Sequence, residues 1–224
     1  MNKPVIIVGA GRMGRFVAQI AIACKRQVSG FLDDTMIVGC FVDNIPVLGG
    51  VDYLEKLDGE TTELVIALSH REVRQRLAIK AKSYCIDLAT LVHPLAMVSE
   101  KCSLGQGVVC QAFSVIHIGA TVSRNVLLEE HCSIGVDVEV GENCVLTPKA
   151  TLNGASKIGP NCFIGSGAIV NPEVHIAGEC TIGAGAVVIN SLTTSGTYAG
   201  IPAKKLQENF VSRNKENVTL ADET

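Results

Sequence analysis

A six-residue repeat in the second half of the chain constrains the fold more than any other feature of the sequence. Residues 102–191 divide into 15 consecutive hexads without an insertion, and the third position of every hexad is apolar. The first position is small or β-branched throughout, and Gly follows the third position in six hexads. One large and one small inward residue per hexad predict a three-sided parallel β-helix, in which each hexad supplies a short strand and a tight corner.

Three hexads form one coil of 18 residues, so this repeat predicts about five coils. Strands stacked about 4.8 Å apart would give a prism roughly 20–25 Å tall, with residues 18 apart lying above one another. Cys144, Cys162 and Cys180 have this spacing at an inward position. Core packing of small apolar side chains explains them, with a metal or redox role as the alternative. We predict core packing and no metal site.

The residues before this repeat have a different pattern, in which β-branched runs alternate with amphipathic stretches. The runs at 5–8, 28–32 and 64–68 are expected to be strands, and residues 12–25 and 71–82 are expected to be helices. Strands separated by helices imply a parallel α/β sheet.

The two patterns predict an α/β plus all-β chain of two domains and a tail. We expect a Rossmann-like domain over residues 1–100, a β-helix over 101–207 and a polar tail over 208–224. The segment GTYAGIPAKKL breaks the six-residue period, so we expect the chain to leave the β-helix there.

Composition excludes several classes of protein. A net charge of −3 over 224 residues does not fit a polybasic nucleic-acid binder, and 4% aromatic residues without Trp do not fit a base-stacking protein. No apolar run approaches the roughly 20 residues that span a bilayer. Nine Cys residues without an export signal predict reduced thiols in the cytoplasm.

A glycine motif follows the first expected strand. Gly9, Gly11 and Gly14 match G-x-G-x-x-G and open a helix, a context in which backbone N–H groups approach phosphate. Asp33 and Asp34 end the second strand, where an acid that binds ribose is expected. The motif favours a nucleotide sugar. A purely structural turn and a dinucleotide are the alternatives, and an α/β part of about 100 residues is short for a dinucleotide domain.

Three histidines are candidates for the site. His70 follows a strand and begins a helix, where it could contact a ligand. His117 and His131 lie in the middle hexads, and His131 is close in sequence to Glu129 and Asp137. A neighbouring carboxylate can orient an imidazole and raise its pKa, as a general base requires. The alternative is a solvated charged corner.

The order of these pieces resembles a known family. VIIVGAGRMG, GFLDD, IPVLGGVDYL, LVIALSHREVRQRLA, LATLVHPLAMVS, the hexads and AGIPAKKL are similar to the bacterial sugar O- and N-acyltransferases typified by sialic acid O-acetyltransferase and the bacillosamine-pathway N-acetyltransferase. This resemblance implies that the N-terminal domain binds a nucleotide sugar. It also implies a left-handed β-helix that forms a homotrimer and binds acetyl-CoA between neighbouring subunits.

The same resemblance implies roles for individual residues. The backbone N–H of Gly154 is expected to contact the thioester carbonyl, with Gly165, Gly183 and Ala184 as further contacts of acetyl-CoA. The residues implied for the nucleotide sugar are Gly9, Gly11, Arg12, Asp33, Asp34 and His70.

The chain departs from the family pattern at the expected base. The family stretch N-T-G-A-x-I-x-H-D falls on residues 129–137, which places Val136 at the base, and a second family His falls on Val145. The acid after the base is retained as Asp137. Loss of the base favours N-acylation, because a fraction of an amine is already neutral near pH 7, or a relocated base. His131 is the first substitute and His117 the second.

The sequence therefore predicts an acetyl-CoA-dependent acyltransferase that N-acetylates a nucleotide-linked amino sugar in surface-glycan biosynthesis. It predicts no nucleic-acid, membrane or metal partner. Two alternatives remain open. One is a homologue that keeps the ligand pockets and has lost the chemistry, and the other is a hexapeptide acyltransferase with a different acceptor or acyl group.

Overall fold

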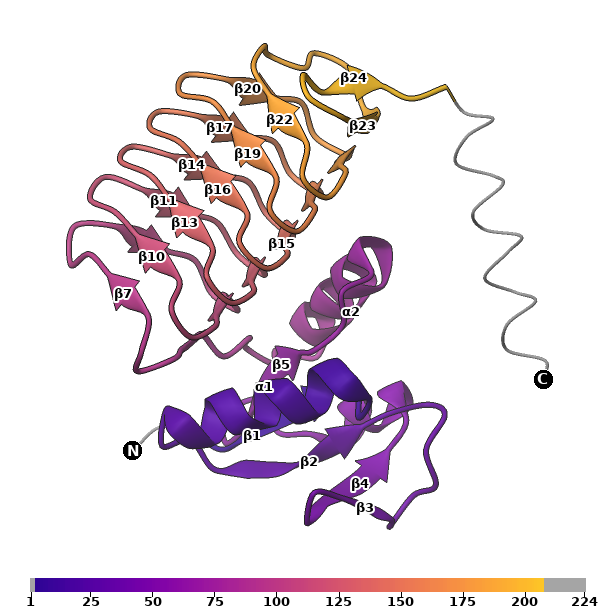
Figure 1. The fold of residues 1–224 in the computed structure, drawn as a ribbon. Coiled ribbons are helices and arrows are strands. Elements are labelled where there is room, and N and C mark those ends of the chain that lie inside the picture. The colour runs from indigo at the N-terminus through magenta and orange to yellow at the C-terminus, as the bar shows by residue number, and fades with distance from the viewer. Residues whose placement is uncertain (1–2, 208–224) are drawn as a thin grey trace.

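The computed structural model describes residues 3–207, so the expected polar tail 208–224 lies outside the described residues. A small α/β domain is followed by a tall β-helix, and Figure 1 shows the two parts in contact along the first coils. This arrangement confirms the predicted fold class.

The N-terminal domain has one five-stranded sheet in the order β3-β4-β2-β1-β5. All neighbours are parallel except β3 and β4. The strands are β1 (Val5–Val8), β2 (Val28–Leu32), β3 (Phe41–Val42), β4 (Ile45–Gly49) and β5 (Glu63–Ile66). The helices are α1 (Arg12–Ala23), α2 (Arg71–Ser83) and the 3-10 helix η1 (Val51–Lys56).

Both faces of this sheet are covered, because side chains of β1 alternate between them. Val5 and Ile7 pack in one core with α1, whereas Ile6 and Val8 pack in a second core with α2. The first core also contains Leu127 of the β-helix. A continuous apolar core therefore joins the two domains.

Three sheets form the walls of the β-helix, and each is named here by its first strand. All their strands pair in parallel except β24, which is antiparallel to β23. The β6 sheet contains β6 (Leu91–Val92), β9 (Val109–Cys110), β12 (Leu127–Leu128), β15 (Val145–Leu146), β18 (Phe163–Ile164), β21 (Cys180–Ile182), β23 (Gly196–Ala199) and β24 (Lys204–Lys205). The β7 sheet contains β7 (Met97–Val98), β10 (Val115–Ile116), β13 (Ser133–Ile134), β16 (Thr151–Leu152), β19 (Ile169–Val170) and β22 (Val187–Val188). The β8 sheet contains β8 (Ser103–Leu104), β11 (Thr121–Val122), β14 (Glu139–Val140), β17 (Lys157–Ile158) and β20 (His175–Ile176).

Residues 18 apart pair from coil to coil, as the repeat predicts; Leu128, for example, pairs with Leu146. The third-position aliphatic residues fill the interior with the small first-position residues. Cys144, Cys162 and Cys180 are completely buried in that interior. Their stacking is direct, because the backbone N–H of Cys162 donates to Sγ of Cys144 over 3.4 Å.

Both ends of the β-helix extend beyond the expected hexads. Strands β6 and β7 already pair with β9 and β10, so the first coil starts before residue 101. Val92 and Val98 continue the spacing of the third position, which explains this early start. At the other end, the expectation that GTYAGIPAKKL leaves the β-helix is wrong for its first residues, which form β23, whereas β24 turns back antiparallel to β23. Strand β23 pairs with β21, and Tyr198 packs into the core as a cap.

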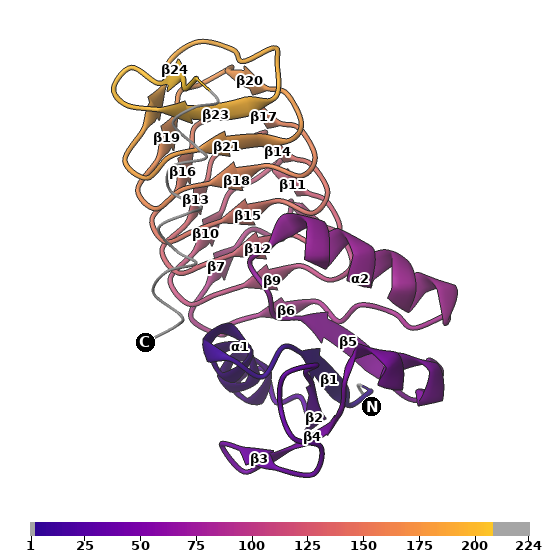
Figure 2. The same ribbon diagram turned by 90° about the vertical axis from the view of Figure 1, so that its right-hand side faces the viewer.

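Each coil has three corners, two named here by the helix beside them and one by its glycine. The α1 corner follows the strands of the β6 sheet and contains Gln111, Glu129, Thr147 and Gly165. The Gly154 corner follows the β7 sheet and contains His117, Val136 and Gly154, and the α2 corner follows the β8 sheet and contains Asn125, Asn143 and Asn161. Figure 2 shows α2 beside the first coils and α1 below them. Within residues 3–207, no helix combines the length and apolar character needed to cross a membrane.

Candidate functional site

The glycine motif forms a tight loop at the carboxyl edge of the N-terminal sheet. Gly9 has a φ of +97°, which favours glycine. A Cβ on Gly14 would lie 1.9 Å from the Gly9 carbonyl oxygen, so α1 can approach β1 only with glycine there. A Cβ on Gly11 would meet nothing within 4 Å. Gly11 therefore leaves open space at the start of α1, where backbone N–H groups can bind an anion.

Asp33 lies beside this loop, but its carboxylate already has partners within the domain. Oδ2 accepts the backbone N–H of Ala10 over 2.8 Å, and Oδ1 accepts hydrogen bonds from the N–H and hydroxyl of Thr35. Burial alone would raise the pKa of Asp33, yet the hydrogen bonds from Thr35 and Ala10 outweigh it and lower the pKa. Asp33 is an ionised anchor of the glycine loop.

The other residues expected at the nucleotide differ in whether their side chains already have partners within the protein. Asp34 accepts the backbone N–H of Val51 over 2.7 Å and so fixes the start of η1. The exposed side chain of Arg12 makes no hydrogen bond within residues 3–207 and stands at the first turn of α1. His70 precedes α2 at the carboxyl end of β5, where its Nδ1 lies 2.9 Å from Glu72 Oε2. Both side chains of that pair are mostly exposed.

The Gly154 corner brings together most of the residues expected around the thioester. Gly154 lies one coil above Val136, and its added Cβ would be 3.4 Å from the Val136 carbonyl oxygen. The N–H of Gly154 donates no hydrogen bond within residues 3–207. Asp137 lies over Gly119 at the same corner, and His117 precedes this turn one coil below. An amide donor without a partner in the described residues is therefore present at the same corner as Asp137.

His131 does not share that corner. It lies at the α1 corner, and strand β13 separates it from Asp137. Its exposed ring is stacked on Phe113, with ring centroids 5.1 Å apart and an angle of 16° between the rings. No hydrogen bond or ion pair joins His131 to a carboxylate in the described part of the chain. The expectation that a neighbouring carboxylate orients this imidazole is therefore not met.

Glu129 lies two residues before His131 at the α1 corner. Its sequence position alone predicted no more than a carboxylate near that histidine. Only 9% of the residue is exposed. Burial, reinforced by the negative charge of Glu130, raises the pKa of Glu129 to about 7. One feature of the sequence could have drawn attention to Glu129. It follows the inward Leu128, at the hexad position that is Gly in six other hexads.

The same corner contains two glycines expected at acetyl-CoA. A Cβ on Gly165 would lie 2.5 Å from the backbone nitrogen of Ala184, so close stacking of the coils requires glycine there. A Cβ on Gly183 would lie 3.1 Å from Cβ of Ala199, and Ala184 is exposed. Of these three residues, Ala184 presents the most open surface.

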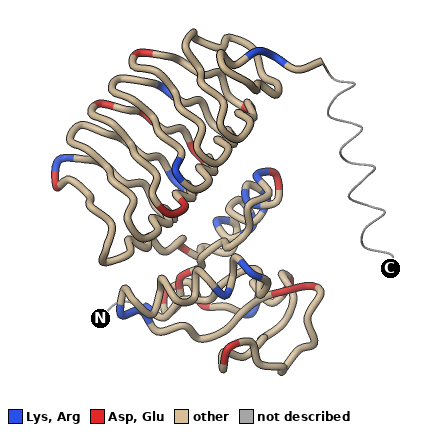
Figure 3. The backbone as a smooth tube through the Cα atoms, viewed as in Figure 1, with Lys and Arg blue, Asp and Glu red and all other residues tan. Residues whose placement is uncertain are grey.

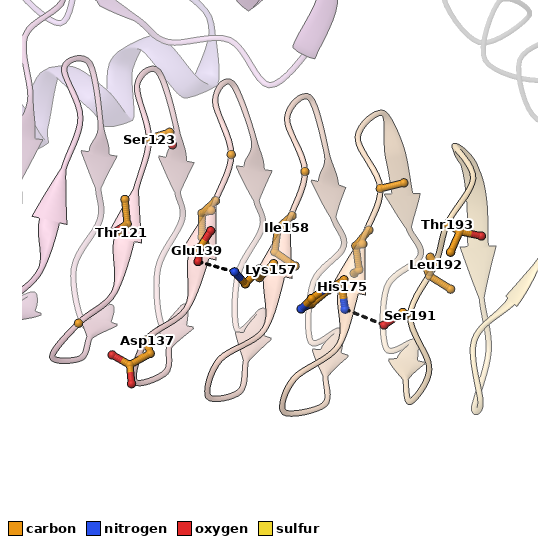
Figure 4. Close-up of a pocket in the computed structure, with 16 residues that line it drawn as sticks. Thr121, Ser123, Asp137, Glu139, Lys157, Ile158, His175, Ser191, Leu192 and Thr193 are labelled. Atoms are coloured by element: carbon orange, nitrogen blue, oxygen red, sulfur yellow. Dashed lines mark hydrogen bonds and ion pairs between the residues drawn. The ribbon is translucent and has the colours of Figure 1, made fainter.

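A groove of about 950 Å³ runs across several coils on the outer face of the β8 sheet. Figure 4 shows Asp137 at the turns along one side and a row of Glu139, Lys157 and His175 along the strands. Lys157 Nζ pairs with Glu139 Oε1 over 2.8 Å. The backbone N–H of His175 donates to the hydroxyl of Ser191. The groove is long, has a mixed polar and apolar lining, and adjoins the Gly154 corner.

Charge elsewhere is dispersed. Figure 3 shows basic and acidic residues mixed over both domains without a large patch of one sign. Among residues 3–207, no cluster of three His, Cys, Asp or Glu side chains has an arrangement suited to a metal ion.

Comparison with known proteins finds matches for both domains of the chain. Residues 4–81 match the PglD N-terminal domain, and residues 155–190 match the bacterial transferase hexapeptide repeat. The acetyltransferase domain of PglB from Neisseria gonorrhoeae is 30% identical, with a TM-score of 0.87 over 92% of this chain and 100% of that chain. This chain belongs to the PglD-type hexapeptide acyltransferase family. None of the curated proteins matches it.

Two further structures of similar fold extend the comparison. PerB from Caulobacter crescentus, in complex with CoA and GDP-perosamine, is 29% identical over 92% of this chain and 99% of that chain, with a TM-score of 0.86. WeeI from Acinetobacter baumannii is 20% identical over 92% of this chain and 100% of that chain, with a TM-score of 0.83. The PglD-type fold thus extends over both domains of the chain.

Proposed function

We propose that this protein transfers the acetyl group of acetyl-CoA to the amino group of a nucleotide-linked sugar, as a cytoplasmic homotrimer in surface-glycan biosynthesis. The observation that carries the proposal is the similarity of the whole chain to PerB, a protein crystallised with CoA and GDP-perosamine. PerB is similar over 92% of this chain, which supports a nucleotide sugar at the glycine loop and CoA at the Gly154 corner.

In this proposal the N-terminal domain binds the nucleotide. The open backbone at Gly9 and Gly11 and the first turn of α1 suit a diphosphate, because helix N-termini favour anions. Arg12 adds a positive charge at that turn. Asp33 contributes indirectly by anchoring the loop through the N–H of Ala10. His70 lies on the same edge of the sheet, within the range of a sugar or nucleotide extending from the loop.

The β-helix then presents the thioester. The unused N–H of Gly154 is suited to bind the oxyanion that forms when an amine attacks the carbonyl carbon. The groove on the β8 sheet begins beside this corner and has room for a long cofactor. Lys157 and His175 supply positive or hydrogen-bonding groups for CoA phosphates. A neighbouring subunit would cover the open side of this groove.

The test is release of CoA thiol from acetyl-CoA across a panel of GDP-, UDP- and dTDP-linked amino sugars, with hydroxyl-only analogues as controls. We expect turnover with amino acceptors alone. Turnover with hydroxyl analogues would replace N-acylation with O-acylation. Binding of acetyl-CoA or of a nucleotide sugar without turnover would identify a homologue that has lost its chemistry.

A further inference from the structure

We propose that a cleft between α2 and the α2 corner binds a phosphorylated monosaccharide, at a site separate from those proposed for the transfer reaction. The cleft has a volume of about 370 Å³, and Figure 2 shows α2 beside the first coils, which supply its other wall. Clefts that hold small molecules range from roughly 300 to 1,000 Å³. A cleft near the lower end of that range suits a ligand of the size of one sugar.

One stripe of α2 forms the first wall of the cleft. Gln75, Ala78, Ile79 and Lys82 line it, and their spacing of three and four residues places them on one face of the helix. The side of α2 that faces the β-helix is therefore not completely covered by it. Ile79 is 65% exposed although it lies on that side, so it offers an apolar surface to a ligand in the cleft.

Three successive coils form the second wall, and each contributes two neighbouring residues of the α2 corner. These pairs are Arg124 and Asn125, Glu142 and Asn143, and Pro160 and Asn161. The asparagine is the more buried member of every pair. The asparagines therefore form the floor of the cleft, and the other three residues form its rim.

Two cations approach the cleft from opposite walls. Lys82 belongs to α2 and Arg124 to the β-helix, and neither side chain makes a hydrogen bond or an ion pair within residues 3–207. Arg124 is half-buried, which restricts where its guanidinium can lie. Guanidinium and ammonium groups form strong, charge-assisted hydrogen bonds to phosphate oxygens. A phosphate group between Lys82 and Arg124 would join the two domains.

The ladder of asparagines in the floor ends in an unused donor. Arg74 donates to Asn125 Oδ1, which turns the Asn125 amide so that its Nδ2 donates to Asn143. Asn143 in turn donates to Asn161 Oδ1. Nδ2 of Asn161 has no acceptor within residues 3–207, and it lies at the cleft because Asn161 lines it. The direction of the ladder thus leaves one amide donor for a ligand.

The remaining lining suits a body that carries hydroxyl groups. The exposed Glu142 carboxylate has no partner within residues 3–207 and can accept hydrogen bonds, while Nδ2 of Asn161 can donate one. Ile79 and Pro160 provide apolar surface for the C–H groups of a sugar ring. No aromatic residue lines the cleft, so a nucleobase would find no ring on which to stack. These features favour a sugar phosphate over a nucleotide.

The cleft is distinct from the nucleotide site proposed at the glycine loop. Helix α2 starts after His70 at the carboxyl edge of the N-terminal sheet and runs toward the opposite edge. At a rise of 1.5 Å per residue, Lys82 lies about 18 Å from His70 along the helix. A ligand held by Lys82 and Arg124 is therefore separate from one held at the glycine loop.

The test is calorimetric titration of the full-length protein with glucose 6-phosphate, with inorganic phosphate and glucose as comparison ligands. We expect glucose 6-phosphate to bind most tightly. Lys82→Gln and Arg124→Gln should each raise its Kd at least about tenfold, the scale of one charge-assisted hydrogen bond. Both side chains lack partners within residues 3–207, so neither substitution should unfold the protein. Arg76→Gln, on the exposed side of α2, is the control and should leave the Kd unchanged.

Methyl NMR of isoleucine-labelled protein locates the ligand independently. Glucose 6-phosphate should shift the methyl signals of Ile79, whereas those of the exposed Ile22 on α1 should not move. Absence of binding, or a Kd that Lys82→Gln and Arg124→Gln both leave unchanged, would overturn the proposal. Equal affinity for inorganic phosphate would overturn the assignment of a sugar phosphate. None of these measurements needs acetyl-CoA or turnover, so failure of the proposed function would not alter their outcome.

Discussion

Arg74 Nη2 donates one hydrogen bond to the backbone oxygen of Asn125 and another to its side-chain Oδ1, each over 2.8 Å. Arg74 is completely buried, and burial lowers its pKa to about 10. Nη1 donates to the carbonyl oxygens of Ile66 and Leu68 at the end of β5. One guanidinium therefore ties α2, the N-terminal sheet and the β-helix together.

A ladder of asparagines extends this contact along the α2 corner. Asn125 Nδ2 donates to Asn143 Oδ1, and Asn143 Nδ2 donates to Asn161 Oδ1, each over 2.7 Å. Arg71, one turn before Arg74, donates to the backbone oxygen of Asn161 over 2.6 Å. Two arginines on one side of α2 thus fix the glycine loop relative to the β-helix, which keeps the two proposed ligand sites in register.

Replacing Arg74 with Leu should lower the free energy of unfolding by about 3 kcal/mol. The change leaves the acceptors on Ile66, Leu68 and Asn125 buried and unpaired, and losses of this size follow when one partner of a buried charged network is removed. Chemical denaturation measures the loss. Arg76→Leu, on the exposed side of the same helix, is the control. An equal effect of the two substitutions would mean that the contact between Arg74 and Asn125 adds nothing to the free energy of unfolding.

Gly14→Ala should destabilise the protein and weaken nucleotide binding, because the new Cβ would lie 1.9 Å from the Gly9 carbonyl oxygen. Relief requires α1 to move away from β1, and overpacking of this kind costs roughly 1–3 kcal/mol or more. Gly11→Ala introduces the same methyl group into open space and should preserve the melting temperature. Thermal unfolding of the two variants distinguishes close packing from a general intolerance of alanine in the loop.

Lys157→Glu should raise the Kd for CoA about tenfold, because it places a negative charge in the groove proposed for the cofactor. The effect should shrink at high salt, since exposed charges are screened. Calorimetric titration at two salt concentrations measures both. Lys56→Glu, on η1, provides the same charge change away from the groove. A Kd unaffected by Lys157→Glu would place CoA elsewhere on the surface.

Much of the fold could be predicted from the sequence, because its regularity is local. The hexads repeat a strand and a corner, so one period specifies all three walls, and the same register reaches Val92 and Val98. The end of the β-helix was harder to predict. Strand β23 departs from the hexad spacing and is held by pairing with β21 and by the burial of Tyr198, and such contacts leave no periodic signal.

The site was less predictable, since its chemistry depends on which corner a residue occupies. Asp33 matched the position of a ribose ligand, yet its carboxylate is used by Ala10 and Thr35. His131 and Asp137 are six positions apart in sequence, but strand β13 lies between them. The high pKa of Glu129 arises from burial and from the charge of Glu130, and burial at a corner leaves no periodic signal in the sequence.

Thiol labelling should distinguish the buried cysteine column from the surface. Cys85 is exposed, whereas Cys144, Cys162 and Cys180 are completely buried. Burial also raises the pKa of the Cys132 thiol to about 12, which disfavours the reactive thiolate. At pH 8 we expect the fastest labelling at Cys85, which Cys85→Ser removes, slower labelling at the half-buried Cys24, Cys40 and Cys102, and reaction of the column only on unfolding. Mass spectrometry identifies the labelled sites. Rapid native labelling of Cys162 would contradict its place in the core.

Glu129 should make the protein less stable as pH rises from about 5 to 8. Its pKa is about 7 in the folded chain, above the ordinary value near 4.3, so the folded state holds a proton that the unfolded state has lost. Stability from this group is therefore complete at low pH and is lost as pH passes through 7, with a slope of at most about 1.4 kcal/mol per unit.

Glu129→Gln removes this titration, so urea denaturation at pH 5 and pH 8 should show wild type losing stability relative to the variant. Other carboxylates and histidines titrate equally in both proteins, and the difference isolates residue 129. Because the measurement needs neither substrate nor turnover, it reports how the folded protein surrounds the side chain of Glu129. A stability difference that does not change between the two pH values would show that Glu129 titrates like an exposed glutamate, and it would contradict the burial of its side chain.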